Sequence, residues 1–525
     1  MRLLFGGIDS STQSCKLVII DLNLSKILYS DIVNYDKDLP QYKTLNGVIP
    51  GLGEGVSESD PQMWIDAIEL LFNRAKQSNL PLYEIKALSV SGQQHGLVCL
   101  DQHGNLSRSR SKLWNDFSTR DECELLTEAV GGTEKMIAEV GNTQRTGYTA
   151  PKIFHFARHE PEAFKRTTTC FLVHNFVNWY LTGGKNGGVR VMEPGDTSGM
   201  ALWHPGKKEW SQHVIEAISP SLKQKLPPVL PSDRSIGKIS TDLVNRYGFH
   251  PDCKIDAGCG DNMYGAIGTG NVTPGIVTIS LGTSGTAYTF MEQPFIDPEG
   301  EIAAFCDSTG NYLPLLCVSN LANGYNALLQ QYNLTHGQFN EIAIKTKPGC
   351  DGRILIPWYA GERTPDVALA TPLYFGFGLG DFRKEYLCRA VVEGHVLNLY
   401  DGFQRMPVTT KEIRLTGGLS QSEIWCQTIA DMFEAEVVPV QGEGAASGAA
   451  LHAAWIYLKQ QGQEISLQQV VEPFVTLQEN NRKIPVSENM KRYRILKKLY
   501  HTLSKLIRKQ TVEYDPFELR NQLIN

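Results

Sequence analysis

The feature that most constrains the fold is a strand–turn–strand pattern of small polar residues that occurs once in each half of the chain. In "GIDSSTQSCKLVIID" (residues 7–21) and "GIVTISLGTSGTAYTF" (residues 275–290), two apolar runs flank such a turn. The turn residues are Asp9, Ser10, Ser11 and Thr12 in the first segment and Gly282, Thr283, Ser284 and Gly285 in the second. The pattern predicts a β-hairpin in each half. A chain of 525 residues exceeds one usual core, so we expect two related domains.

The remaining periodicity predicts a mixed α/β fold. Strand-like runs at 26–35 and 85–92 enclose a helix at 60–77, for which Asp60 is the expected N-cap and Pro61 the first helical residue. Strands and helices resume after "NRYGFHPDCKIDAGCGDN", which is the best candidate boundary. We therefore expect an N-terminal domain over 1–252, a C-terminal domain over 253–485, and a tail over 486–525.

Composition excludes several classes of function. The formal net charge is -6 and the pI about 6.1, which gives no basic surface for nucleic acid. The 11 cysteines are scattered singly, without zinc-type spacing, and are expected to be reduced. No window holds the roughly 18 apolar residues of a transmembrane helix, and the N-terminus lacks a signal-peptide pattern. We expect a cytoplasmic protein that binds neither nucleic acid nor membrane.

The segment "KRYRILKKLYHTLSKLIRKQ" (491–510) predicts an amphipathic helix with eight basic residues and no acidic ones. A helix that lies on a membrane surface has this composition. A terminal helix that packs its apolar face on the protein and exposes its basic face has it too, and this second interpretation is favoured.

The two turns suggest phosphate binding. Small residues let backbone N–H groups approach an anion, and hydroxyl groups add donors without bulk. Each turn alone is also explained by the steric needs of a hairpin, but the recurrence favours two loops that hold the polyphosphate of a nucleotide from both sides. Asp9 is then placed to bind Mg²⁺, or else it only initiates a turn.

Other glycines suggest where a nucleoside binds. No GxxxxGK[ST] occurs, which excludes a P-loop. Gly417 and Gly418 follow a predicted strand in "RLTGGLSQSEIW", in a flat turn that suits adenine and ribose as well as a tight fold of the backbone. Gly442, Gly444 and Gly448 loosely resemble a dinucleotide fingerprint, but such glycines more often allow close helix packing.

Two further segments carry candidate catalytic and binding residues. Asp261 in "GCGDNMYGAIG" lies where a strand meets a helix, so it is either an N-cap or a carboxylate at the strand ends, where ligands of α/β sheets collect. His95 in "VSGQQHG" follows a buried strand between two glycines. A lone histidine is often structural, but a Gln-Gln-His run in such a loop suits recognition of hydroxyl groups.

Together these segments resemble the FGGY family of carbohydrate kinases over nearly the whole chain. The similar segments, in order, are "GIDSSTQSCKLVIID", "SGQQHG", "LWNDFSTRDE", "GYTAPKIFHFARHEPE", "GCGDNMYGAIG", "ISLGTSG", "WYAGERTP", "CRAVVEG", "LTGGLSQSEIWCQTIAD" and "GEGAASGAALHAAW". The resemblance implies two actin-like (ribonuclease-H-like) domains with a deep cleft between them. It also implies ATP and Mg²⁺ as cofactors and a small sugar as substrate.

By the same resemblance, Asp261 is expected to be the catalytic base, and Gln94, His95 and Asn262 to contact the sugar. The residues expected to bind ATP are Asp9, Ser11, Thr12, Lys16, Gly282, Thr283, Ser284, Gly417, Gly418 and Gly444, with Asp9 also the metal ligand. The expected reaction converts D-xylulose to D-xylulose 5-phosphate. Trp114, Asp116 and Arg145 are further residues that the sequence leaves open as sugar contacts.

Three alternatives remain at this point. The substrate is another ketose or polyol, such as ribulose or sedoheptulose; the protein binds ATP without transferring phosphate, as an actin-like module; or it is a dinucleotide oxidoreductase. The last lacks the acidic ribose partner at the usual spacing. The sequence leaves open a monomer or a homodimer.

Overall fold

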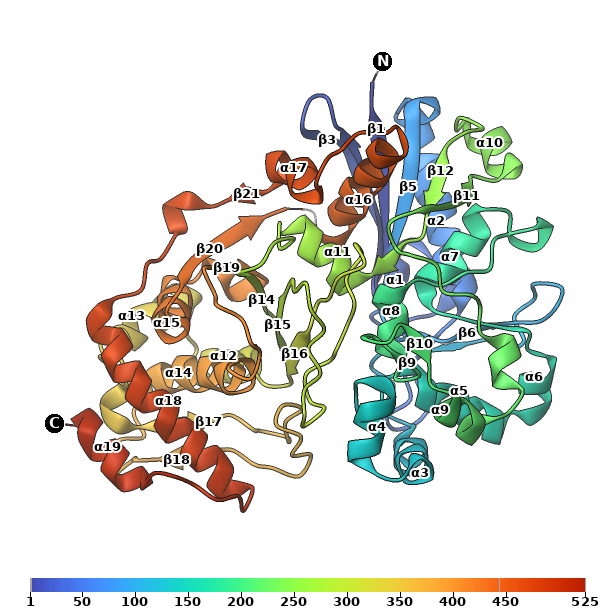
Figure 1. The fold of residues 1–525 in the computed structure, drawn as a ribbon. Coiled ribbons are helices and arrows are strands. Elements are labelled where there is room, and N and C mark those ends of the chain that lie inside the picture. Colours follow the sequence, from blue (N-terminus) through green and yellow to red (C-terminus); the bar gives the residue numbers. More distant parts are fainter. Residues whose placement is uncertain (1, 443, 525) are drawn as a thin grey trace. The chain divides into compact units, whose positions relative to one another are not determined.

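The computed structural model describes residues 2–442 and 444–524, which form two compact units (Figure 1). Unit 1 contains residues 2–272 together with Met291–Leu313 and Gly442–Val475. Unit 2 contains Thr273–Phe290, Pro314–Gln441 and the residues from Thr476 onward. The chain therefore passes between the units several times, and unit 1 extends beyond the boundary expected at 252/253.

The sheet of unit 1 has the strand order β11-β12-β5-β1-β2-β3, with β13 also paired to β5. The strands are β1 (Leu4–Ser10), β2 (Ser14–Asp21), β3 (Lys26–Asn34), β5 (Ile85–Gly92), β11 (Ser235–Lys238), β12 (Lys254–Asp256) and β13 (Cys259–Gly260). The first three are antiparallel neighbours, whereas β5 runs parallel to β1, and β12 and β13 run parallel to β5. This pairing of β12 and β13 with β5 is why unit 1 continues past residue 252.

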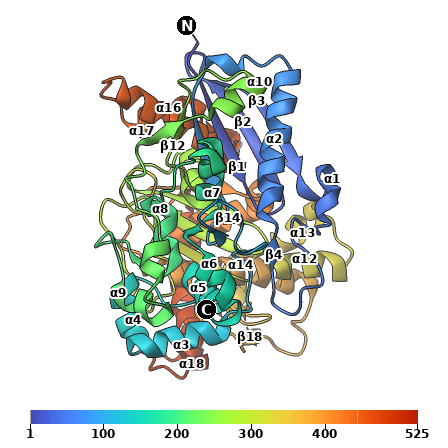
Figure 2. The same cartoon turned by 90° about the vertical axis from the view of Figure 1, so that its right-hand side faces the viewer.

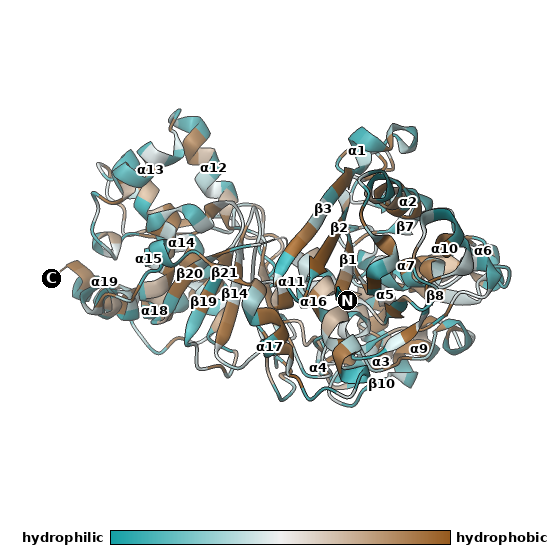
Figure 3. Ribbon diagram, turned by 90° about the horizontal axis from the view of Figure 1, so that it is seen from above, coloured by the Kyte–Doolittle hydropathy of each residue, from teal (hydrophilic) through white to brown (hydrophobic). Residues whose placement is uncertain are grey.

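Alternating side chains of β1 give the sheet two buried faces. Leu4 and Ile8 belong to the core that also contains Trp64 of α2 (Pro61–Gln77). Phe5 faces the other way, and its ring centroid lies 5.4 Å from that of Tyr457 in α16 (Gly444–Gln460). Figure 3 shows the apolar strands β1 and β2 between these two helices, and Figure 2 shows α2 alongside β2 and β3.

Glycines allow α16 to approach the sheet and a second helix, α11 (Asp261–Gly268). A Cβ atom on Gly7 would lie 1.9 Å from the carbonyl oxygen of Ala446, and one on Gly448 would lie 1.9 Å from that of Tyr264. Ala446 and Gly448, which both belong to "GEGAASGAALHAAW", therefore lie at close packing contacts of α16. This agrees with the interpretation that the glycines of this segment allow close helix packing. The strand that precedes them, β20 (Glu436–Gln441), belongs to unit 2, so no strand–helix unit of the dinucleotide-binding kind is formed.

A group of helices with its own apolar core completes unit 1. The elements are α3 (Arg120–Val130), α4 (Thr133–Val140), α5 (Thr149–His159), α6 (Pro161–Arg166), α9 (Gln212–Ile218), β6 (Val98–Leu100) and β8 (Thr169–Phe171). Their core contains Leu126, Met136, Ile153 and Phe156. Helix α7 (Val173–Leu181) packs on β5 and β12 of the main sheet instead.

The sheet of unit 2 repeats the plan of unit 1. Its order is β16-β15-β14-β19-β20-β21, formed by β14 (Ile276–Leu281), β15 (Gly285–Thr289), β16 (Leu315–Val318), β19 (Glu412–Thr416), β20 and β21 (Thr476–Leu477). Strands β14, β15 and β16 are antiparallel neighbours, and β19 and β20 follow as parallel strands. Three antiparallel strands followed by two parallel ones is the order found in unit 1, which confirms the prediction of two related halves.

The basic segment near the C-terminus forms α18 (Ser487–Ile507), which contacts α14 (Lys384–Phe403) and α15 (Glu423–Phe433) within unit 2. Tyr493 and Tyr500 are buried, and their hydroxyl groups donate to Glu393 at 2.8 Å and to Asn398 at 3.0 Å. Basic side chains lie outside this face; Arg494, for example, pairs with Glu434 at 2.6 Å. None of the helices in residues 2–442 and 444–524 is long and apolar enough to cross a membrane.

Candidate active site

Asp9 lies at the end of β1, next to residues of both neighbouring strands. Its register partner in β2 is Lys16, and its partner in the parallel strand β5 is Ser91. The Ser91 hydroxyl donates to Oδ1 of Asp9 at 2.6 Å. Burial raises the pKa of Asp9 to about 6, against the opposing effects of this hydrogen bond and of the Lys16 charge. The side chain is nevertheless partly exposed, so the carboxylate is accessible to a ligand.

The first turn is held by hydrogen bonds within the turn and to two distant segments. The Ser11 hydroxyl donates to the carbonyl oxygen of Ser14 at 2.8 Å, and the Thr12 hydroxyl donates to Gln93 at 3.3 Å and accepts from the indole of Trp114 at 2.9 Å. A Cβ atom on Gly47 would lie 1.8 Å from the Thr12 carbonyl oxygen, so the segment before α2 lies against the turn. Sequence reasoning predicted hydroxyl donors for a phosphate, and in this structure these hydroxyls fix the shape of the turn.

Asp261 is the first residue of α11, and Gly260 is the N-cap. The N-cap interpretation of Asp261 is therefore wrong, because this residue already has helical geometry. Its partly exposed carboxylate accepts from the side-chain amide of Asn262 at 3.0 Å, and the same amide donates to Oε1 of Gln94 at 2.8 Å. Asp261, Asn262 and Gln94 thus form one connected group at the carboxyl ends of β13 and β5.

Electrostatics favour a proton on Asp261. Burial raises its pKa to about 8, and the negative charges of Asp9 and Asp196 act in the same direction. Asp196 lies in α8 (Pro194–Thr197) and pairs with the buried His174 at 2.9 Å. A carboxylate whose pKa is raised toward neutrality is a suitable general base, because a base accepts a proton most effectively when its pKa lies near the working pH.

His95 adopts a left-handed backbone conformation with φ of 66°. Its ring centroid lies 4.9 Å from that of Tyr148 and 5.9 Å from that of Phe305. A Cβ atom on Gly199 would lie 2.6 Å from the His95 ring, so a larger residue there would displace one of the two. Sequence reasoning assigned no role to Tyr148, Phe305 or Gly199, because only the folded chain brings them to His95.

The other three candidate sugar contacts have different surroundings. Asp116 is buried and accepts from the Ser57 backbone at 2.9 Å. Trp114 is partly exposed beside the first turn. The Arg145 guanidinium donates to Thr143 at 3.2 Å.

The glycine-rich turns of unit 2 lie next to each other. Strands β14 and β19 are parallel partners, so the turns that follow them, 282–284 and 417–418, share one edge of the sheet. A Cβ atom on Gly417 would lie 2.6 Å from the Leu281 carbonyl oxygen, and Gly417 has φ of 87°. The carbonyl groups of Gly282 and Thr283 accept hydrogen bonds from backbone N–H groups at the start of α12 (Ala322–Gln331). Thr283 and Ser284 are exposed. Two adjacent, exposed, small-residue turns suit a nucleotide.

Gly444 belongs to unit 1, where it is the first residue of α16 and has φ of 65°. A Cβ atom on Gly444 would have no neighbouring atom within 4 Å among the described residues. It is exposed at a helix N-terminus, where backbone N–H groups favour anions.

The acidic residues suit one hard cation that is shared with a ligand. In the part of the chain that the structure describes, no group of three or more His, Cys, Asp or Glu side chains is placed to hold a metal by itself. Mg²⁺ commonly binds through one or two carboxylates plus the phosphates of a nucleotide. Asp9 fits this role, because it is accessible and a cation there would reduce the repulsion between Asp9 and Asp261.

Comparisons with known proteins agree with this arrangement. Residues 4–268 match the N-terminal domain of the FGGY family of carbohydrate kinases, and residues 277–457 match its C-terminal domain. A xylulose kinase from Haemophilus influenzae is 33% identical over 498 residues, covering 93% of this chain and 96% of that protein. A xylulose kinase from Rattus norvegicus is 30% identical over 470 residues, covering 84% and 85%.

Solved structures support the same fold. A xylulose kinase from Bifidobacterium adolescentis has a TM-score of 0.78 and 26% identity, covering 94% of this chain and 99% of that one. A gluconate kinase from Lactobacillus acidophilus has a TM-score of 0.84 at 22% identity, covering 97% and 98%. The two units and their turns thus define a phosphotransferase with two actin-like domains. The chain belongs to the FGGY family of carbohydrate kinases.

Proposed function

We propose that the protein transfers the γ-phosphoryl group of ATP to the terminal hydroxyl group of D-xylulose, giving D-xylulose 5-phosphate and ADP. The observation that carries this proposal is the accessible carboxylate of Asp261, joined through Asn262 to Gln94. The family supports a sugar as acceptor. The identity of about 30% with proteins named xylulose kinase, over most of the chain, supports this ketose in particular.

In the proposed reaction, Asp261 accepts the proton of the sugar hydroxyl as its oxygen forms a bond to the γ-phosphorus and the bond to ADP breaks. A positioned base of this kind contributes roughly 10² to 10⁴ in rate. Gln94, His95 and Asn262 would bind the other hydroxyl groups and orient the ketose, because a misplacement of about 1 Å can cost about 10²-fold in rate.

Each unit carries proposed nucleotide contacts of its own. In unit 1 they are Asp9, Ser11, Thr12, Lys16 and Gly444, and in unit 2 they are Gly282, Thr283, Ser284, Gly417 and Gly418. Asp9 would hold Mg²⁺, which neutralises charge that develops on the phosphates. In Ser11 and Thr12 we assign the contact to the backbone, since the Ser11 hydroxyl is already bonded within the turn and the Thr12 hydroxyl to Gln93 and Trp114.

We place the protein in the cytoplasm as a monomer or homodimer that acts on small molecules. The 11 free cysteines support a reducing compartment. Cell fractionation tests the cytoplasmic location, and light scattering of the purified protein tests the oligomeric state.

A coupled ADP-release assay tests the function. The purified protein is incubated with ATP and Mg²⁺ and with D-xylulose, D-ribulose, sedoheptulose, glycerol or gluconate. We expect ADP release that depends on sugar, with the highest kcat/KM for D-xylulose. A higher kcat/KM for another compound would replace the substrate, and no sugar-dependent release would refute the kinase activity.

A further inference from the structure

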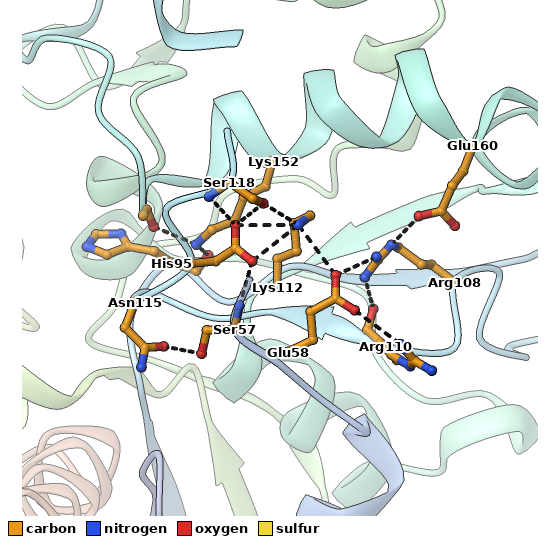
Figure 4. A network of polar contacts seen from close by, with 12 residues as sticks. Ser57, Glu58, His95, Arg108, Arg110, Lys112, Asn115, Ser118, Lys152 and Glu160 are labelled. Carbon is orange, nitrogen blue, oxygen red and sulfur yellow. Dashed lines mark hydrogen bonds and ion pairs between the residues drawn. The ribbon is translucent and has the colours of Figure 1, made fainter. Parts of the chain in front are cut away.

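A buried network of charged residues, shown in Figure 4, lies in unit 1 beside the loop that carries His95. Arg108 pairs with Glu58 at 2.6 Å and with Glu160 at 2.8 Å. Lys112 pairs with Asp116 at 3.2 Å and Glu58 at 3.4 Å. The cations of this network are thus neutralised by carboxylates, which is the usual condition for burying charge.

Lys152 in α5 differs from these cations, although it is fully buried. Among the described residues it has no carboxylate at ion-pair distance. Its ammonium group donates instead to two backbone carbonyl oxygens, that of His95 at 2.8 Å and that of Gly147 at 2.5 Å. Burial lowers its pKa to about 7, which reflects how unfavourable a charge is at this position.

The two carbonyl groups belong to segments that meet at His95. Gly147 precedes Tyr148, whose ring packs against the His95 ring. The Thr149 hydroxyl also donates to the His95 carbonyl oxygen, at 3.2 Å. The orientation of the peptide bond after His95 is therefore fixed by two side chains of one helix.

This peptide needs such support, because a non-glycine residue with positive φ is uncommon and costs about 1 kcal/mol or more. His95 has φ of 66°. Without the two donors, its carbonyl group would lose both of these hydrogen bonds, and the left-handed conformation would lose their support. The ring would then turn away from its place next to Gln94.

We propose that Lys152 is a positioning residue for sugar binding: its ammonium group holds the His95 backbone in the left-handed conformation and fixes the His95 ring against Tyr148. The consequence for the sugar rests on the proposed function, whereas the consequence for the backbone does not. We assign Lys152 no contact with a reacting atom.

Lys152→Met tests the proposal, with Lys225→Met as the matched control. Lys225 is also buried in unit 1 and also donates to a backbone carbonyl oxygen, that of Thr167 at 2.6 Å, away from His95. We expect Lys152→Met to raise the KM for D-xylulose at least 10-fold while the KM for ATP changes less than 2-fold. Lys225→Met should change neither KM, even if it lowers the melting temperature.

A general loss of stability reduces the active fraction, and hence the apparent kcat, but leaves the KM of the folded molecules unchanged. An unchanged sugar KM in folded Lys152→Met would therefore overturn the proposal. If this variant does not fold, Thr149→Val, which removes the second bond to the His95 carbonyl, replaces it. We expect it to raise the sugar KM about 3-fold, and no rise would count against the proposal.

A crystal structure of Lys152→Met, or of Thr149→Val, separates this proposal from the proposed function. We expect φ of His95 to leave the left-handed region in the methionine variant. Retention of φ near 66° would overturn the positioning role, whichever sugar the enzyme uses. If the wild-type protein phosphorylates no sugar but the backbone shifts as expected, only the proposed function fails.

Discussion

At the scale of single residues, the proposed role of Asp261 as the general base predicts how activity depends on pH. Its pKa is raised to about 8 by burial and by the charges of Asp9 and Asp196. Because only the ionised form of the proposed base could accept the sugar proton, we expect kcat/KM for the sugar to rise with pH and to level off above about pH 8. Asp196→Asn removes one negative charge and should move this inflection to lower pH. A profile that is flat from about pH 6 to about pH 9 would contradict the assignment.

The same carboxylate makes stability depend on pH. Between the unfolded pKa near 3.8 and the folded value of about 8, the folded state holds a proton that the unfolded state has released. The free energy of unfolding therefore falls as pH rises through this window. Asp261→Asn should abolish phosphate transfer and raise the melting temperature by a few degrees at pH 8.5, with a smaller gain near pH 5. An equal change at both pH values would exclude this explanation.

At the scale of elements, the contact between α11 and α16 depends on glycine. A Cβ atom on Gly448 would lie 1.9 Å from a backbone oxygen of α11. We expect Gly448→Ala to destabilise unit 1 by about 1–3 kcal/mol, as overpacking does, and to lower the urea midpoint of the first unfolding transition. Gly337 in α13 (His336–Ala343) has open space around its Cβ position, so Gly337→Ala should be neutral or slightly stabilising.

Sequence patterns predicted the elements that depend on local chemistry. Helix α2 begins at Pro61 with Asp60 as its N-cap, because the capping side chain and the apolar spacing act over a few residues. The partners of Asp9 in β5 and the surroundings of Lys152 depend on pairing between distant segments. Neither a strand register nor a buried ammonium group leaves a local pattern, so the sequence alone did not indicate them.

At the scale of the whole molecule, the two sheets share one strand order. The repeated hairpin segments predicted two related halves, but not the order of the strands. The extent of the units was less predictable. The chain shows a change of pattern near residue 252, but unit 1 continues to residue 272 because β13 pairs with β5 and α11 packs on α16. The candidate base, Asp261, lies in this added part.

The position of α16 also has a consequence for biosynthesis. This helix covers one face of a sheet whose first strand begins at residue 4, but the helix itself begins only at residue 444. A ribosome must therefore translate most of the message before the earliest strands obtain their covering layer. Until then the nascent chain exposes an apolar surface, and no fragment cut from the first half can be expected to behave as a finished domain.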